Sequence, residues 1–266
     1  MKKIKILIIV LIILLLIIGI AISLIYKEPK ISVLCYHNVG SKEENDKYPD
    51  NHLWTISVEN FEEEMKYLHD NNYKTLTMDE FYKWKKGEIK VPFKSVLVTF
   101  DDGLLSNYHY AFPILKKYNI NGTIFVIGKN IDNSKSELNE WDGDIMTYMS
   151  KEILDACKEE YPNIEIYSHT YALHEKDAIN QSIEKINDDF ETFNKNIIPS
   201  EYLAYPFGDY NDNIKQVLKD KKYKLAFTFR DNRKATRNDD DYAINRINVS
   251  TDKPLYKFAL RLLLPY

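Results

Sequence analysis

The feature that most constrains the fold is an alternation of short apolar segments with segments of helical periodicity. The alternation recurs about seven times beyond the N-terminus and predicts a mostly parallel sheet with right-handed crossovers. Residues 95–100 are apolar almost throughout, as in a strand that is buried on both faces. The chain of 266 residues is therefore predicted to be an α/β protein, and its length suits a closed or nearly closed barrel.

The individual elements can be placed from periodicity and capping residues. Ser57, Thr77, Ser150 and Asp252 are candidate helix N-caps, and Pro113 is expected to kink or divide its helix. Strands are expected at residues 31–36, 75–76, 95–100, 122–127, 164–167, 202–205, 224–229 and 243–248. Helices are expected at residues 58–68, 78–86, 105–118, 151–160, 176–195, 212–221 and 253–263. Loops are expected at residues 38–55 and 128–149.

The N-terminal segment is basic and then apolar. Three lysines within the first five residues precede a charge-free run from Ile6 to Ile25, about the 20 residues that a helix needs to cross a bilayer. The lysines predict a cytoplasmic N-terminus and an external domain. We expect an uncleaved single-pass membrane anchor at residues 1–27 and one external domain at residues 28–266. The alternative is a secreted protein, released by cleavage near Ala21-Ile22-Ser23.

The bulk composition excludes some classes of function. A formal net charge of -4 and the lack of a dense basic patch argue against a nucleic-acid partner. The two cysteines, Cys35 and Cys157, give no disulfide framework and are expected to be buried thiols. We expect the protein to be a monomer.

Three expected strand ends carry residues suited to chemistry. Asp101 and Asp102 follow one strand directly, His169 and His174 follow another, and residues 206–208 end a third. In a parallel barrel these ends lie on one face, where ligands bind. One carboxylate and two imidazoles leave coordination positions open, as catalytic zinc requires, although cobalt, nickel and iron also suit them. The second carboxylate is then free to accept a proton from an activated water molecule.

Each of these motifs has a simpler structural interpretation when taken alone. Asp-Asp-Gly and Pro-Phe-Gly are common in turns, and an isolated histidine pair is more often a surface feature than a ligand pair. Their joint occurrence at successive strand ends favours a single functional site.

The same three motifs resemble those of a known family. They are Thr99-Phe100-Asp101-Asp102-Gly103, Ser168-His169-Thr170 with His174, and Tyr205-Pro206-Phe207-Gly208. They are similar to the first three motifs of the NodB-like polysaccharide deacetylases, carbohydrate esterase family four, and the resemblance covers roughly residues 30–250. It implies a distorted (β/α) barrel and metal-dependent removal of N-acetyl, sometimes O-acetyl, groups from polysaccharide sugars.

The resemblance also implies roles for individual residues. It makes Asp101 the catalytic base and makes Asp102, His169 and His174 the ligands of a divalent metal, with zinc as the first choice. The third motif, with Tyr205, Pro206 and Gly208, would form a wall of the acetyl pocket. The backbone N–H of Tyr205 is then the candidate donor to the oxyanion.

Two positions depart from the usual pattern of the family. Ala204 stands where the family commonly has an arginine that orients the base, and Arg246 is either its substitute or a structural arginine. No histidine follows His174, so the usual late general acid is missing. However, residues 34–39 resemble the opening strand of the subgroup that deacetylates poly-β-1,6-N-acetylglucosamine. In that subgroup an early histidine takes the place of the acid, and His37 is the matching residue.

The predicted function is removal of N-acetyl groups from N-acetylglucosamine residues of an extracellular polysaccharide, with poly-β-1,6-N-acetylglucosamine as the first choice. Trp141, in an expected loop, is the best candidate for an aromatic platform under a sugar ring. The alternatives within enzymes are a peptidoglycan or chitooligosaccharide N-deacetylase and an O-acetyl esterase. From another class, the alternative is a catalytically weakened, membrane-anchored module that binds glycan.

Overall fold

The computed structural model describes residues 2–25, 29–51, 53–138, 140–141, 143–175 and 180–264. Helix α1 (Lys2–Ile25) forms in the apolar N-terminal segment, and its side chains from Ile4 to Ile20 are exposed. Among the described residues, no helix has both the length and the apolar character needed to cross a membrane. This finding does not support the predicted transmembrane anchor at residues 1–27, of which residues 1, 26 and 27 lie outside the described residues.

The body of the protein is built on one large sheet in which every strand pair is parallel, as the alternation of elements predicts. The order along the sheet is β10-β9-β8-β7-β6-β5-β1-β11, and β4 pairs with β5 outside this path. The strands are β1 (Ser32–Tyr36), β4 (Lys74–Thr75), β5 (Ser95–Phe100), β6 (Gly122–Val126), β7 (Ile164–Ser168), β8 (Tyr202–Ala204), β9 (Leu225–Thr228), β10 (Ile244–Asn245) and β11 (Ile247–Asn248).

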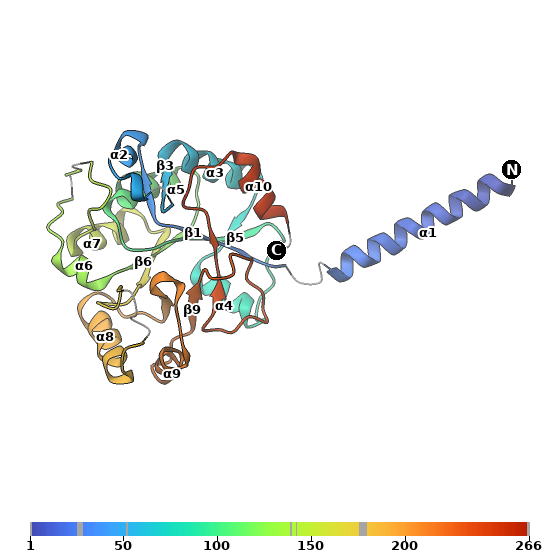
Figure 1. The fold of residues 1–266 in the computed structure, drawn as a ribbon. Coiled ribbons are helices and arrows are strands. Elements are labelled where there is room, and N and C mark those ends of the chain that lie inside the picture. The colour runs from blue at the N-terminus through green and yellow to red at the C-terminus, as the bar shows by residue number, and fades with distance from the viewer. Residues whose placement is uncertain are drawn as a thin grey trace.

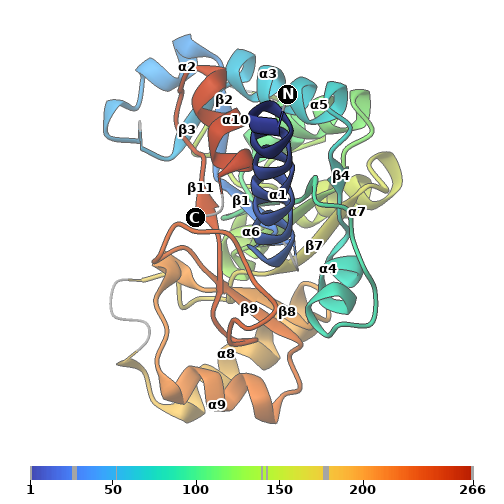
Figure 2. The ribbon, with the colours of Figure 1, turned by 90° about the vertical axis from the view of Figure 1, so that its right-hand side faces the viewer.

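The two ends of this sheet belong to one short segment, residues 244–248. β10 pairs with β9, and β11 pairs with β1, where it lies in Figure 2. Arg246 alone separates the two strands. The segment expected as one strand at residues 243–248 therefore changes partner at Arg246 and closes the sheet into a near-barrel, as predicted.

Helices surround the strands, as Figure 1 shows. The larger ones are α3 (Val58–Asp70), α4 (Met78–Lys85), α5 (Phe112–Lys117), α6 (Gly128–Asn133), α7 (Lys151–Glu160), α8 (Ile183–Asn196), α9 (Asp212–Asp220) and α10 (Leu255–Leu263). The predicted N-caps Ser57, Thr77 and Ser150 are confirmed, since each side chain accepts a hydrogen bond from a backbone N–H of the following first turn. Pro113 lies in the first turn of α5, and the turn before it, Asn107–Ala111, is π-helical. The helix expected at 105–118 is thus divided.

Several local predictions are wrong. The expected loop at residues 128–149 begins with helix α6. The helix expected at residues 176–195 starts only at Ile183, and residues 176–179 lie outside the described residues. The expected loop at residues 38–55 contains regular structure, because Ser41 and Glu44 form a capping box that starts a short helix. Its elements are β2 (Asn38–Gly40), α2 (Lys42–Asp46), a 3-10 turn (Pro49–Asn51) and β3 (Thr55–Ser57), with β2 and β3 paired in parallel. Asp252 caps no helix, because α10 begins only after Pro254. Its carboxylate instead accepts a hydrogen bond from the Ser57 N–H at 2.7 Å.

The interior of the barrel is filled by apolar side chains from several strands. Leu97, Phe125 and Phe227 belong to one buried cluster together with Phe81 and Trp84 of α4. A second cluster lies between the sheet and α3, α5 and α7. Both cysteines are buried free thiols, as predicted. This packed body holds the ends of β1, β5, β7 and β8 in fixed relative positions.

Candidate active site

The two carboxylates of the Asp-Asp-Gly motif point in different directions. The Asp101 N–H donates to the Tyr36 carbonyl at 3.0 Å, so Asp101 continues the pairing of β5 with β1 and stays inside the barrel. The next two residues have positive φ angles, 74° at Asp102 and 82° at Gly103. This left-handed conformation is uncommon for a residue with a side chain, although aspartate adopts it more readily than most. The chain turns there and carries the Asp102 side chain away from that of Asp101.

Asp102, His169 and His174 lie together, as the sequence predicts. The Asp102 Oδ1 atom is 3.5 Å from His169 Nε2 and 3.4 Å from His174 Nε2. The three potential ligand atoms all lie within 4.8 Å of one another. The turn that brings the two histidines together passes through Thr170, whose φ is 68°. One oxygen and two nitrogens in this arrangement suit a divalent transition metal with open coordination positions.

The contacts around these three residues support that interpretation. The His169 Nδ1 atom is 2.8 Å from the Ala204 carbonyl, which can only accept, so Nδ1 carries a proton and Nε2 is the ring nitrogen that faces Asp102. The buried Asp102 Oδ1 has no hydrogen-bond partner among the described residues. Burial lowers the pKa of His174 to about 4, so this imidazole is neutral near pH 7, as a ligand must be.

Arg246 forms a bidentate salt bridge with Asp101. Arg246 Nη1 donates to Asp101 Oδ1 at 2.7 Å and Nη2 donates to Oδ2 at 2.6 Å. Both side chains are fully buried. Burial alone would raise the pKa of Asp101, but the adjacent guanidinium lowers it below its usual value. The carboxylate therefore stays ionised, with both oxygens fixed by one planar group.

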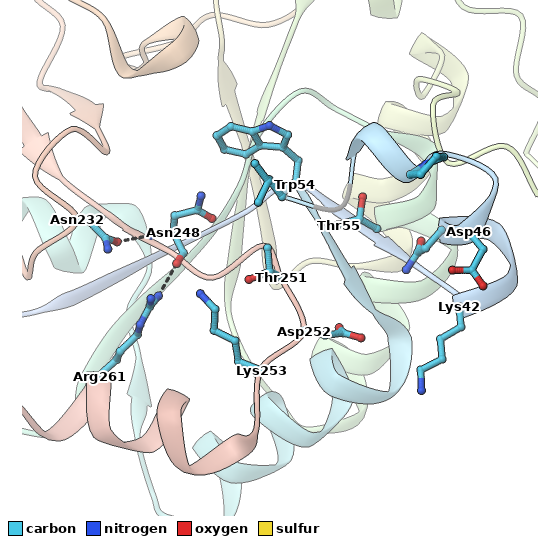
Figure 3. A pocket seen from close by; sticks show the side chains of 13 residues that line it. Lys42, Asp46, Trp54, Thr55, Asn232, Asn248, Thr251, Asp252, Lys253 and Arg261 are labelled. Carbon is cyan, nitrogen blue, oxygen red and sulfur yellow. Dashed lines mark hydrogen bonds between the residues drawn. The ribbon is translucent and has the colours of Figure 1, made fainter.

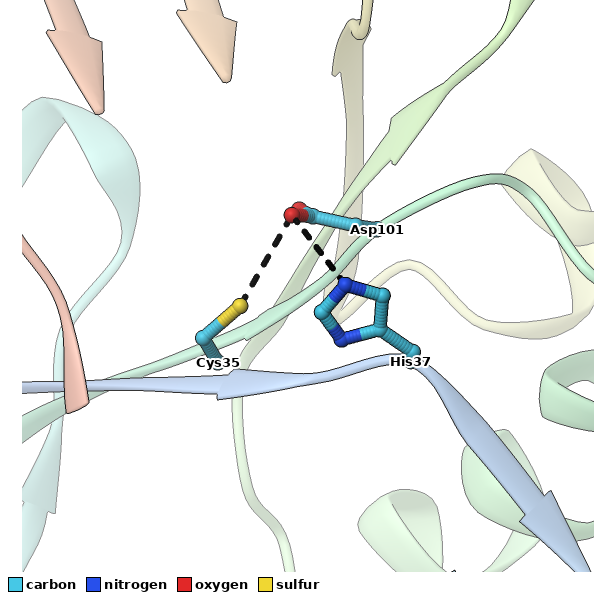
Figure 4. Close-up of side chains that lie close together, drawn as sticks. All are labelled: Cys35, His37 and Asp101. Carbon is cyan, nitrogen blue, oxygen red and sulfur yellow. Dashed lines mark hydrogen bonds and ion pairs between the residues drawn. The ribbon is translucent and has the colours of Figure 1, made fainter. Parts of the chain in front are cut away.

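Cys35 of β1 and His37, the residue that follows this strand, both lie close to Asp101, as Figure 4 shows. The His37 Nε2 atom is 3.9 Å from Asp101 Oδ2, and the Cys35 Sγ atom is 3.7 Å from the same oxygen. His37 Nδ1 is 3.1 Å from Ser250 Oγ, and that hydroxyl donates to the Cys35 carbonyl. Ser250 therefore accepts from Nδ1–H, which leaves the Nε2 lone pair on the side of Asp101. Burial lowers the pKa of His37.

The third motif lies at the same end of the barrel, but it offers a different donor from the predicted one. The Tyr205 N–H donates to the Phe227 carbonyl at 3.0 Å, so it is unavailable for an oxyanion. Pro206 is buried, and the Gly208 carbonyl accepts from the Thr228 hydroxyl. Phe207 has a φ of 57°, and no acceptor for its N–H is found among the described residues.

Phe207 also contacts His174 directly. Its ring centroid is 4.7 Å from that of His174, and the side chain is 49% exposed. The sequence contains no signal for this role, because a positive φ at a phenylalanine cannot be read from Pro-Phe-Gly. A free backbone N–H beside the histidines is a better candidate for oxyanion contact than the N–H of Tyr205.

Trp141 does not have the environment of a sugar platform. Its indole N–H donates to Glu44 at 2.8 Å, and its ring stacks on His109 with centroids 5.0 Å apart. The predicted role is therefore not supported. Trp54 lies instead beside the site, with its ring centroid 4.6 Å from that of His37. The sequence does not single out Trp54, because its contact with His37 depends on the pairing of β2 with β3.

Comparisons with known proteins agree with this geometry. Residues 88–226 match the family described as Polysaccharide deacetylase. The chain is 32% identical over 228 residues to the protein YxkH of Bacillus subtilis, covering 84% of this chain and 73% of the relative. It is 31% identical over 253 residues to the poly-beta-1,6-N-acetyl-D-glucosamine N-deacetylase of Staphylococcus aureus, covering 86% of this chain and 82% of the relative.

A solved structure shares the fold. The deacetylase PplD of Streptococcus pyogenes, in complex with acetate, superposes with a TM-score of 0.74 at 23% identity, covering 88% of this chain and 99% of that one. The barrel, the Asp-His-His cluster and the sequence matches lead to the same conclusion: this chain belongs to the polysaccharide deacetylase family and is a deacetylase hydrolase.

Proposed function

We propose that this protein removes N-acetyl groups from N-acetylglucosamine residues of an extracellular polysaccharide, with the help of a divalent metal ion. The observation that carries the proposal is the Asp102–His169–His174 cluster next to the buried Asp101–Arg246 pair. Poly-β-1,6-N-acetylglucosamine is the proposed substrate, because the Staphylococcus aureus relative that carries this activity in its name aligns with 86% of the chain.

Each residue has a distinct task in the proposed reaction. Asp102, His169 and His174 would hold the ion, which would acidify water and polarise the acetyl carbonyl. Asp101 accepts a proton from the attacking water, while Arg246 keeps its carboxylate ionised and oriented. The Phe207 N–H is placed to donate to the oxygen that becomes negative when water adds to the amide carbon.

The leaving amine also needs a proton. His37 Nε2 carries a lone pair and lies 3.9 Å from Asp101 Oδ2. It is placed to take the proton that Asp101 removed from water and to pass it to the amine nitrogen as the C–N bond breaks. The products are acetate and a free glucosamine unit. With Arg246 and His37 in these positions, the departures from the usual family motifs no longer argue for a weakened glycan-binding module.

The test of the proposed function is acetate release by the purified full-length protein. We expect release from poly-β-1,6-N-acetylglucosamine to exceed release from peptidoglycan or chitooligosaccharides. We also expect a chelator to abolish release and one of zinc, cobalt, nickel or iron to restore it. His169→Ala serves as the control, because restored metal should not rescue a protein that lacks a ligand. Full activity after chelation would overturn the metal-dependent mechanism, and release from peptidoglycan alone would overturn the substrate.

His37→Ala is expected to lower kcat about a hundredfold and to leave the metal content unchanged, because the residue moves a proton and binds no ion. The measurement is acetate release together with metal analysis of the same preparation. His69→Ala is the matched control, since His69 is exposed on α3 and its ring lies against Tyr118. Loss of metal in His37→Ala would instead make His37 a ligand or a structural residue.

A further inference from the structure

Cys35 is a buried free thiol that the proposed reaction does not use. Together with His37 and Asp101 it forms a second cluster of potential metal ligands, whose ligand atoms lie within 4.8 Å of one another. The Asp101 Oδ2 atom is 3.7 Å from Cys35 Sγ and 3.9 Å from His37 Nε2. Figure 4 shows the sulfur and the nitrogen facing the same carboxylate. This cluster shares no residue with the cluster around Asp102.

The contacts of His37 leave a lone pair that faces a negative charge. The Ser250 hydroxyl donates to the Cys35 carbonyl, so it accepts from His37 Nδ1–H. The Nε2 lone pair then faces the Asp101 carboxylate across 3.9 Å. Two acceptors that face each other repel unless a proton or a cation lies between them. A metal ion between these two atoms would accept both lone pairs.

Asp101 can bind such an ion without losing Arg246. Each oxygen of a carboxylate has two lone pairs. Arg246 uses one on each oxygen, since Nη1 donates to Oδ1 and Nη2 donates to Oδ2. The Oδ2 atom therefore keeps a lone pair for a metal. Because the guanidinium balances the charge of Asp101, a thiolate at Cys35 would supply the negative charge that compensates the ion.

The donor set determines the class of ion. A thiolate and an imidazole favour zinc, cobalt and similar ions over magnesium and calcium, which prefer oxygen ligands. Metal–ligand distances in a tetrahedral zinc site are about 2.0–2.3 Å, so its ligand atoms lie about 3.3–3.6 Å apart. The observed separations of 3.7 Å and 3.9 Å are close to these values. A small movement of the side chains would therefore complete the site.

Solvent comes closest to the cluster on the side of His37. The His37 side chain is 11% exposed, whereas that of Asp101 is fully buried. The ring centroid of Trp54 is 4.6 Å from that of His37, and Trp54 is 37% exposed. Figure 3 shows Trp54 at the edge of a pocket of about 960 Å³. An ion that enters from this pocket would meet His37 before the two buried ligands.

We propose that Cys35, His37 and Asp101 form a second, inhibitory site for zinc or another divalent ion that binds thiolates. When the ion binds, the Cys35 S–H bond breaks, a sulfur–metal bond forms and the proton passes to water. Nothing is oxidised or reduced. The ion then occupies the carboxylate oxygen and the imidazole nitrogen that move protons in the proposed reaction. The inhibitory role rests on the proposed function, whereas binding of the ion does not.

The second site should fill after the cluster around Asp102. A thiol has to lose its proton there, in a buried position next to a guanidinium, which weakens binding. The first equivalent of metal is therefore expected to activate the enzyme, and an excess of zinc is expected to inhibit it.

Cobalt titration of the metal-free full-length protein tests the site without any substrate. A thiolate ligand gives Co²⁺ a charge-transfer band in the near ultraviolet, and the cluster around Asp102 contains no sulfur. The wild-type protein should show this band only beyond the first equivalent of cobalt. Cys35→Ser should lose the band, because a hydroxyl is a poor ligand for this class of ion. Cys157→Ser is the matched control and should keep it, since Cys157 is the other buried free thiol and lies on α7.

His37→Ala provides a second test that does not depend on the folding of Cys35→Ser. It keeps both thiols and removes one ligand, so the band should shift to higher cobalt concentrations. A band at unchanged concentrations would exclude His37 from the site and overturn the proposal.

Acetate release tests the inhibition. The dissociation constant of zinc at the second site is measured by displacement of the cobalt band. At about ten times this concentration, about a tenth of the sites are free, so the wild-type protein should keep about a tenth of its activity with one equivalent. Cys35→Ser should keep its own activity with one equivalent unchanged by the excess. Magnesium at the same concentration should inhibit neither protein.

Two results of the titration would overturn the site: no band in the wild-type protein at any cobalt concentration, or a band that is lost in Cys157→Ser and kept in Cys35→Ser. Equal inhibition of wild type and Cys35→Ser by excess zinc would overturn the inhibitory role. If no polysaccharide is deacetylated with one equivalent of metal, the proposed function fails, and the cobalt band still decides whether the second site exists.

Discussion

Replacement of Asp101 by asparagine is expected to lower the rate of deacetylation about a thousandfold, within the range that a positioned general base contributes. An amide cannot accept the proton from water that the carboxylate would take. The measurement is kcat for acetate release from the polysaccharide, with metal content determined on the same protein. The metal should stay bound, because Asp102, His169 and His174 form a separate set of ligand atoms.

Folding has to be checked in this variant, since Asp101 is also the partner of the buried Arg246. Asparagine has one oxygen for two guanidinium N–H groups, so part of the ion pair is lost. Asp79→Asn is the matched control, because Asp79 pairs with Lys83 on the exposed surface of α4. A folded Asp101→Asn protein with undiminished acetate release would show that another group acts as the base.

Most of the Asp102–His169–His174 cluster could be predicted from the sequence. Asp102 and His169 lie at the ends of strands, and His174 follows His169 by five residues. Their residue types and their positions at one edge of the barrel could therefore both be predicted. The local sequence does not define the roles of Arg246 and His37, because each role depends on contacts between distant parts of the chain. The partners Arg246 and Asp101 are 145 residues apart, and they meet only because residues 244–248 close the barrel.

Unusual backbone conformations explain why the oxyanion donor could not be predicted from the sequence. Asp102, Thr170 and Phe207 lie in three different motifs, and each has a positive φ without being glycine. Such conformations cost free energy and occur most often at functional sites, where the surrounding structure holds them in place. In this protein they separate two carboxylates, bring two imidazoles together and free one backbone N–H. Residue type alone did not reveal these turns, so Tyr205 was predicted as the oxyanion donor and Phe207 was not.

The environment of the tryptophans could not be read from the sequence either. Trp141 lies in a segment rich in polar residues, which suggested an exposed ring near the substrate. Its N–H and one ring face are instead used by Glu44 and His109. Trp54 reaches His37 because β2 and β3 pair in a segment that was expected to be a loop. Both errors come from long-range packing that a local pattern does not report.

Arg246→Met is expected to reduce the free energy of unfolding by about 3–5 kcal/mol, the typical cost of removing one partner of a buried ion pair. The variant leaves the Asp101 carboxylate fully buried without its counter-charge. It also removes the side chain that ties the junction of β10 and β11 to the end of β5. The measurement is urea-induced unfolding, followed by circular dichroism. Arg230→Met is the matched control, because the Arg230–Asp209 pair is about half exposed and surface pairs contribute little.

A double variant separates the charge effect from the loss of packing. Arg246→Met combined with Asp101→Leu replaces both charges by apolar groups, which is often neutral or stabilising for a buried pair. We expect this protein to recover most of the stability lost in Arg246→Met and to remain inactive. If Arg246→Met were as stable as the wild type, the ion pair would not be holding the base, and Asp101 would need another source of orientation. If the double variant were as unstable as Arg246→Met, the guanidinium would act mainly through packing at the closure of the barrel.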